Sequence, residues 1–269
     1  MTILSEFGIQ TLFTVGILLL FGAWLSLCRR LFCRLLGGAG ARILLCTGVL
    51  GTPVHELSHA AMCLLFGHQI TGMRLFRPSA DGPLGYVYHR YNPRNPYQSV
   101  GNFFIGIAPI LGGSGVLLLL LYLLLPDICG EVMDAMLSPP AGAKNLLGDY
   151  MGRIGGVVLA LFSAQAVRQW LWWIFLTFSV MIAGHMEISP ADIRTGLRGL
   201  LYLLLLLLAV DAVLYMVWPV GLSGLTNGCM TFSCLITGFL TLSAVCATAM
   251  VLLAGIGRGV MALCGYRAY

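Results

Sequence analysis

Charged residues are scarce in this chain of 269 residues. Asp, Glu, Lys and Arg together make up 9% of it, whereas about a quarter of a typical soluble domain is charged. Lysine occurs once, at Lys144, so the net charge of +5 comes from arginine. This scarcity excludes an ordinary soluble enzyme, and the 59% hydrophobic content excludes a disordered chain.

The chain also lacks basic stripes with interleaved aromatic residues. Such stripes are typical of nucleic-acid-binding proteins, so we expect no nucleic acid partner. The arginines stand mostly between apolar runs, a position that favours contact with the phosphate headgroups of a lipid bilayer. The bilayer is therefore the first expected partner.

Paired cysteine motifs are missing too. The nine cysteines are scattered, often lie inside apolar runs and form no C-x-x-C. This pattern indicates reduced cysteines that pack as small hydrophobic residues, rather than a disulfide framework or a zinc knuckle.

Long apolar runs are abundant by contrast. A helix needs about 20 residues to cross the hydrocarbon core of a bilayer, and six runs are long enough: about 8–28, 42–66, 100–125, 154–184, 197–218 and 230–256. The sequence thus predicts an all-α polytopic protein with about six transmembrane helices, a multi-pass integral protein of the cell membrane. We expect a single membrane-embedded domain over 1–269, with its core at about 42–200 and extra helices at 1–41 and 201–269.

The fourth run is longer than one crossing needs and has Arg168 near its middle. It is either one tilted helix with a snorkelling arginine or a helix that leaves the membrane before Trp170. We predict one tilted helix.

The loop at 67–99 joins the second and third runs. Its stretch from Gly85 to Tyr91 is rich in aromatic and β-branched residues and predicts a short strand. Two interpretations remain open for Tyr86 and Tyr88. They belong either to a strand edge that binds an extended peptide substrate or to an aromatic belt at headgroup level.

The second run contains His55-Glu56-Leu57-Ser58-His59, an H-E-x-x-H motif. Residues four apart share a helix face, so His55 and His59 can bind one zinc ion (Zn2+). Glu56 lies beside them and can act as general base. The sequence also predicts that the helix begins here, with Thr52 as its N-cap.

A catalytic zinc needs a third protein ligand. The best candidate is Asp192, which follows Ser189 and Pro190 between the fourth and fifth runs. His185 is the alternative third ligand, and Glu187 is a further candidate. Asp192 also suits the third position of a capped helix, and one residue can perform both roles.

In these motifs the chain resembles the site-2 protease family of zinc-dependent intramembrane metalloproteases. The resemblance covers about 42–200 and rests on H-E-x-x-H inside a membrane segment, followed by a later segment that begins Gly101-Asn102-Phe103. It implies a zinc cofactor, an aspartate as third ligand and a membrane protein or peptide substrate, with Asn102 as a substrate contact. The family's Asn-Pro…Asp-Gly element is replaced here by the segment that ends at Asp192, which indicates a divergent member.

The sequence leaves two functions in competition. The first is a membrane-embedded metallopeptidase that hydrolyses a membrane or juxtamembrane peptide bond. The alternative is a non-hydrolytic membrane protein that binds or transports a divalent metal through the same polar centre. Asp211, inside the fifth run, either pairs with Arg168, lines the cavity or stays protonated in a helix contact.

Overall fold

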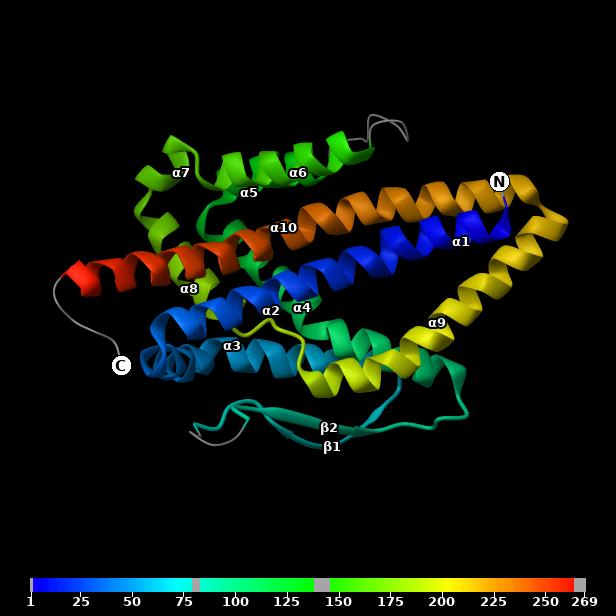
Figure 1. Ribbon diagram of the computed structural model, residues 1–269, viewed down its shortest axis with the longest axis horizontal. Coiled ribbons are helices and arrows are strands. Elements are labelled where there is room, and N and C mark those ends of the chain that lie inside the picture. Colours follow the sequence, from blue (N-terminus) through cyan, green and yellow to red (C-terminus); the bar gives the residue numbers. More distant parts are fainter. Residues whose placement is uncertain (1, 79–82, 138–145, 264–269) are drawn as a thin grey trace.

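The computed structural model describes residues 2–78, 83–137 and 146–263, and in them the chain is almost entirely helical (Figure 1). The elements, in chain order, are α1 (Ile3–Thr11), a π-helical turn (Leu12–Gly16), α2 (Ile17–Leu36), α3 (Gly38–Leu65), β1 (Gln69–Arg74), β2 (Tyr86–Arg90), α4 (Pro96–Leu124), α5 (Pro126–Leu137), α6 (Leu146–Leu161), α7 (Ala164–Arg168), α8 (Trp170–Ala183), α9 (Pro190–Val217) and α10 (Pro219–Leu263).

Several of these helices are long and apolar enough to cross a membrane. Among the described residues five helical stretches meet that condition: Ile3–Leu36, Pro96–Leu124, Gly148–Arg168, Pro190–Val217 and Pro219–Met261. Helix α3 is not among them, because the polar side chains of its H-E-x-x-H motif lower its mean hydropathy. The predicted all-α class is confirmed, whereas the predicted count of six spans is not.

The run at 154–184 is not the single tilted helix that we predicted. It is divided among α6, α7 and α8. The hydroxyl of Ser163 accepts a hydrogen bond from the Ala166 N–H and so begins a new helix, and Gln169 has an extended backbone. The indole of Trp172 donates to the Leu161 carbonyl at the end of α6. The Ser163 cap and the hydrogen bond from Trp172 to Leu161 therefore divide the run into separate helices.

The predicted start of the motif helix at Thr52 is also wrong. Helix α3 begins at Gly38, and Pro53 lies inside it. Because proline has no N–H, the carbonyl of Val49 loses its usual helical partner at this point. The motif thus lies in the second half of a long helix rather than in its first turn.

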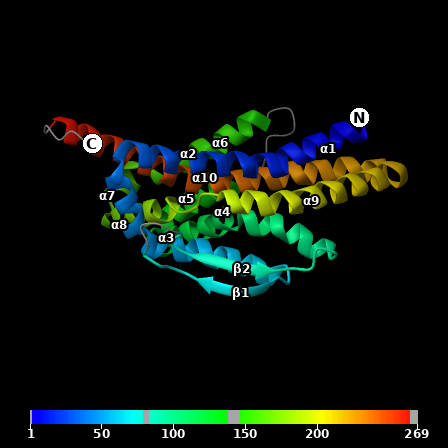
Figure 2. The same cartoon turned by 60° about the horizontal axis from the view of Figure 1, so that its bottom comes forward.

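The two strands form an antiparallel hairpin, which confirms the short strand predicted between the second and third runs. Gln69 pairs with Arg90 and Arg74 pairs with Tyr86, with an irregularity between Ile70 and Gly72. The hairpin lies along one side of the helical bundle beside α3 (Figures 1 and 2).

Helices α3, α4 and α9 pack together and position the motif. A Cβ atom on Gly106 of α4 would lie 2.9 Å from the carbonyl oxygen of Asp192, so only glycine permits this approach of α4 to the start of α9. The main hydrophobic core is built largely from buried residues of α2, α4, α5, α6, α8 and α10. Helix α4 therefore contacts both this core and the helices that carry the motif.

Candidate metal centre

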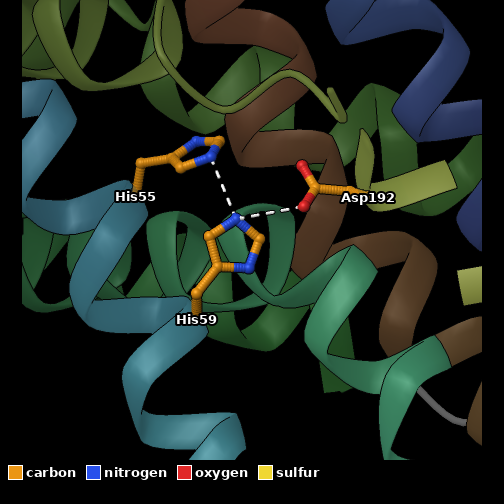
Figure 3. A group of neighbouring side chains, drawn as sticks. All are labelled: His55, His59 and Asp192. Atoms are coloured by element: carbon orange, nitrogen blue, oxygen red, sulfur yellow. Dashed lines mark hydrogen bonds and ion pairs between the residues drawn. The ribbon is translucent and has the colours of Figure 1, made fainter. Parts of the chain in front are cut away.

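Three of the predicted residues come together in the structure. His55 and His59 project from successive turns of α3, and Asp192 reaches them from the first turn of α9 (Figure 3). The two Nε2 atoms are 3.1 Å apart, and His59 Nε2 lies 3.6 Å from Asp192 Oδ1. One ligand atom from each residue lies within 4.8 Å of the other two, a spacing that one ion could bridge after a small contraction.

Backbone contacts fix the orientation of both imidazole rings. His55 Nδ1 lies 2.6 Å from the carbonyl oxygen of His185, and His59 Nδ1 lies 2.8 Å from that of Ile105. A carbonyl oxygen can only accept, so each Nδ1 carries a proton and donates it. Each Nε2 therefore directs a lone pair at the centre of the group, the arrangement found in metal-binding histidines.

The donor set fits a metal cation. Two neutral imidazoles in this orientation would point two lone pairs at each other from nitrogens 3.1 Å apart, which is unfavourable unless a positive charge lies between them. The carboxylate of Asp192 on the third side supplies a compensating negative charge. Two imidazole nitrogens and one carboxylate oxygen are a ligand set typical of catalytic zinc, with a fourth position left for water.

Asp192 also caps its own helix. Its Oδ2 accepts from the Ser189 N–H at 3.0 Å, and its own N–H donates to Ser189 Oγ at 3.1 Å, which completes a capping box. The other oxygen, Oδ1, faces His59. The cap thus fixes the carboxylate without using the oxygen that points at the imidazoles.

The two other candidate ligands are turned elsewhere. The ring of His185 packs against Gly51, where a Cβ atom would lie 2.4 Å from ring carbon Cδ2, and its Nε2 is 3.0 Å from the Thr47 hydroxyl. Only the backbone carbonyl of His185 contacts the group, through His55. Glu187 forms an ion pair with Arg29 of α2.

Glu56 is buried beside the group and faces the hairpin. A Cβ atom on Gly85 would lie 2.7 Å from Glu56 Cγ and 2.9 Å from its Oε1. The backbone that leads into β2 therefore passes directly over this carboxylate.

All of these groups open into one cavity of about 640 Å³. Its wall combines α3, the loop before β2, β2 itself and the start of α9. It is lined by Arg29, Thr52, His55, Glu56, His59, Pro83, Leu84, Gly85, Tyr86, Val87, Tyr88, His89, Tyr91, Ile105, His185, Glu187, Ser189, Ala191, Asp192 and Thr195.

The predicted substrate contacts divide into two groups. Tyr86 and Tyr88 line the cavity, with their rings stacked at a centroid distance of 4.5 Å. Asn102 does not line it: it is fully buried in α4, and its amide donates to the Ser99 carbonyl at 3.3 Å. The structure thus brings the tyrosines to the site and leaves Asn102 outside it.

Arg29 and His89 line the cavity, although neither had a predicted role in the site, and His89 contacts His68, which does not line the cavity. Arg29 comes from α2, outside the predicted core of 42–200. His68 Nδ1 lies 3.0 Å from His89 Nδ1, and His68 Nε2 donates to the Gln98 carbonyl. Burial lowers the pKa of both histidines below the usual value. The only sequence signal was the position of His89 in the predicted strand.

Comparisons of the chain with protein-family models, with curated proteins and with solved structures gave no match. The resemblance to site-2 proteases therefore rests on the motif residues themselves.

Proposed function

We propose that the protein is a zinc-dependent, membrane-embedded metallopeptidase, a divergent relative of the site-2 proteases, that hydrolyses a peptide bond of a membrane or juxtamembrane substrate. The observation that carries this proposal is the convergence of His55, His59 and Asp192 within 4.8 Å, beside Glu56 and a cavity of about 640 Å³. The five apolar helical stretches support placement in a membrane. We further propose that α3 completes a six-span arrangement, and that the membrane is the cell membrane.

Each residue has a distinct role in the proposed reaction. His55, His59 and Asp192 would bind zinc, which supplies Lewis-acid polarisation of the scissile carbonyl and acidifies water. Glu56 would take a proton from the attacking water on a carboxylate oxygen and transfer it to the leaving amine. Burial of Glu56 under the Gly85 backbone limits the contact of its carboxylate with bulk water.

The hairpin is the proposed substrate platform. Consecutive residues from Gly85 to His89 line the cavity, whereas no residue of β1 does so. Strand addition uses backbone hydrogen bonds and presents an extended peptide, the conformation that a protease needs for attack on the carbonyl. Tyr86 and Tyr88 would then contact substrate side chains.

The decisive experiment compares wild-type protein with Glu56→Gln after purification in detergent. Zinc content and hydrolysis of a library of fluorescence-quenched apolar peptides are measured on the same samples. We expect the substitution to retain zinc and to lower hydrolysis by about 10²- to 10⁴-fold, the contribution typical of a general base. Glu187→Gln is the matched control, because Glu187 is another cavity carboxylate but pairs with Arg29.

Equal hydrolysis by wild type and Glu56→Gln would overturn the enzymatic proposal. Zinc binding without any hydrolysis would favour the alternative, a membrane protein that binds or transports a divalent metal.

A further inference from the structure

A second polar cluster lies between α1, α9 and α10, away from the candidate metal centre. It consists of Glu6, Gln10, Asp211 and Thr226, all of them buried. The amide Nε2 of Gln10 lies 3.1 Å from Asp211 Oδ1 and 2.9 Å from Thr226 Oγ1. The Thr226 hydroxyl in turn lies 2.6 Å from Glu6 Oε2. Four polar groups from three helices thus form one hydrogen-bonded chain.

The cluster has more acceptors than donors. The two amide protons of Gln10 are directed at Asp211 and Thr226, and the hydroxyl proton of Thr226 is directed at Glu6. Asp211 Oδ2 and Gln10 Oε1 have no hydrogen-bond partner, although both residues are 0% exposed. Each buried oxygen without a donor is costly, so the cluster lacks positive charge or protons.

Among the described residues, no cationic side chain lies beside either carboxylate. In the part of the chain that the structure describes, Glu6 and Asp211 form no ion pair, so the pairing of Asp211 with Arg168, one of the three roles considered for it from the sequence, is not formed. Two unpaired carboxylates inside an apolar bundle are expensive. A bound divalent cation would make the cluster neutral.

We propose that Glu6, Gln10, Asp211 and Thr226 form a binding site for a hard divalent cation of the calcium class. Every ligand atom on offer is oxygen, which hard cations prefer and which distinguishes this site from the imidazole-containing centre. The two carboxylates, the amide and the hydroxyl supply about six oxygens, within the range that calcium accepts. The Gln10 amide would turn its oxygen to the ion, in place of the nitrogen that now contacts Asp211.

The position of the site gives the cation a structural role. The buried residues of α9 are Gly196, Gly199 and Asp211. The two glycines pack against α4 near the start of α9, so Asp211 is the buried contact of its second half. A cation at Asp211 would link the second half of α9 to α1 and α10. The three helices come together at one end of the bundle (Figure 1).

The two sites are far enough apart for separate measurement. Asp192 and Asp211 lie on the same helix, and their separation corresponds to about 28 Å along its axis. Substitution at one site therefore leaves the ligands of the other in place.

The test is equilibrium dialysis of the detergent-purified full chain against radiolabelled calcium, after chelation and gel filtration. We expect about one calcium ion per wild-type chain and an affinity at least about tenfold lower in Asp211→Asn and in Glu6→Gln. Asp192→Asn is the matched control: it changes a carboxylate on the same helix and should leave calcium binding unchanged.

Thermal unfolding provides a second readout, because a cation that binds only the folded chain stabilises it. Calcium should raise the unfolding midpoint of wild type and of Asp192→Asn, but not that of Asp211→Asn, which lacks one of the two charges that the ion neutralises. Absence of calcium binding to wild type would overturn the proposal. So would unchanged binding in correctly folded Asp211→Asn and Glu6→Gln, or a wild-type midpoint that responds to acidic pH and not to calcium, since protons would then be the ligand.

Discussion

The candidate metal centre and the Glu6–Asp211 cluster are both buried polar groups in an apolar protein, yet they are built in opposite ways. The metal centre combines a local pair, four residues apart on α3, with one distant aspartate, and it opens into a cavity. The Glu6–Asp211 cluster takes its residues from three helices and offers a cation only oxygen ligands, once the Gln10 amide turns. An open cavity lets a substrate reach a metal, and imidazole nitrogens suit a catalytic zinc, so we associate the metal centre with a reaction. The Glu6–Asp211 cluster is closed and offers oxygen ligands, so we associate it with a structural role.

The largest expected effect is loss of zinc from the metal centre. His55→Ala and His59→Ala should each reduce zinc from about one ion per chain to nearly none, because one imidazole and one carboxylate cannot retain a catalytic zinc. Metal content of detergent-purified protein measures this. His68→Ala is the control, since His68 is a buried histidine that contacts His89 and Gln98 instead. Full zinc content in both single variants would show that the motif is not the site.

The second effect separates the two roles of Asp192. Asp192→Asn should weaken zinc binding by more than the 10- to 100-fold that loss of an outer-shell partner costs, because it removes the charge facing His59. Ser189→Ala breaks the capping box but leaves that carboxylate, so it should cost about 1 kcal/mol of stability and change zinc affinity little. Competitive zinc titration and denaturant unfolding measure the two quantities. Equal weakening in both variants would mean that Asp192 acts only as a cap.

Sequence alone could predict the parts of the site that depend on helical periodicity. The motif His55, Glu56 and His59 lies on one helix, and Asp192 follows a Ser-Pro signal that begins the next one, so local rules bring each residue to the right face or end. The same rules failed where a contact came from a distant segment. Arg29 reaches the cavity because α2 packs beside α3, which no local pattern encodes.

The same distinction between local and distant contacts decides which features of the fold the sequence could predict. The apolar runs predicted an all-α chain, because helical length and hydropathy are local properties. The break of the run at 154–184 was missed, since it depends on the Ser163 cap and on the return bond from Trp172 to Leu161. The continuation of α3 through Pro53 was missed because packing of the long helix outweighs the local cost of proline. The partners of Asp211 depend on the packing of three helices, so the sequence left its role open.

A third prediction tests whether the His185 backbone carbonyl, which contacts His55, contributes to zinc affinity. Gly51→Ala places a methyl group 2.4 Å from the His185 ring, so this ring and the adjoining carbonyl that fixes His55 must shift. We expect zinc affinity to fall by about 10- to 100-fold, as for other lost outer-shell partners. Gly155→Ala is the matched control, because its added Cβ meets no atom within 4 Å. An unchanged zinc affinity in Gly51→Ala would show that the His185 carbonyl does not orient His55.

The smallest effect is expected at the Arg29–Glu187 ion pair. This pair is partly exposed, in contrast to the buried Glu6–Asp211 cluster. These side chains are 30% and 26% exposed, so water and salt screen their attraction, and such pairs contribute about 1 kcal/mol or less. Glu187→Gln should therefore lower the free energy of unfolding slightly, by an amount that shrinks as salt is added. Zinc content should not change, because Glu187 points at Arg29 rather than at the two imidazoles. Loss of zinc from Glu187→Gln with retention in Asp192→Asn would instead make Glu187 the third ligand.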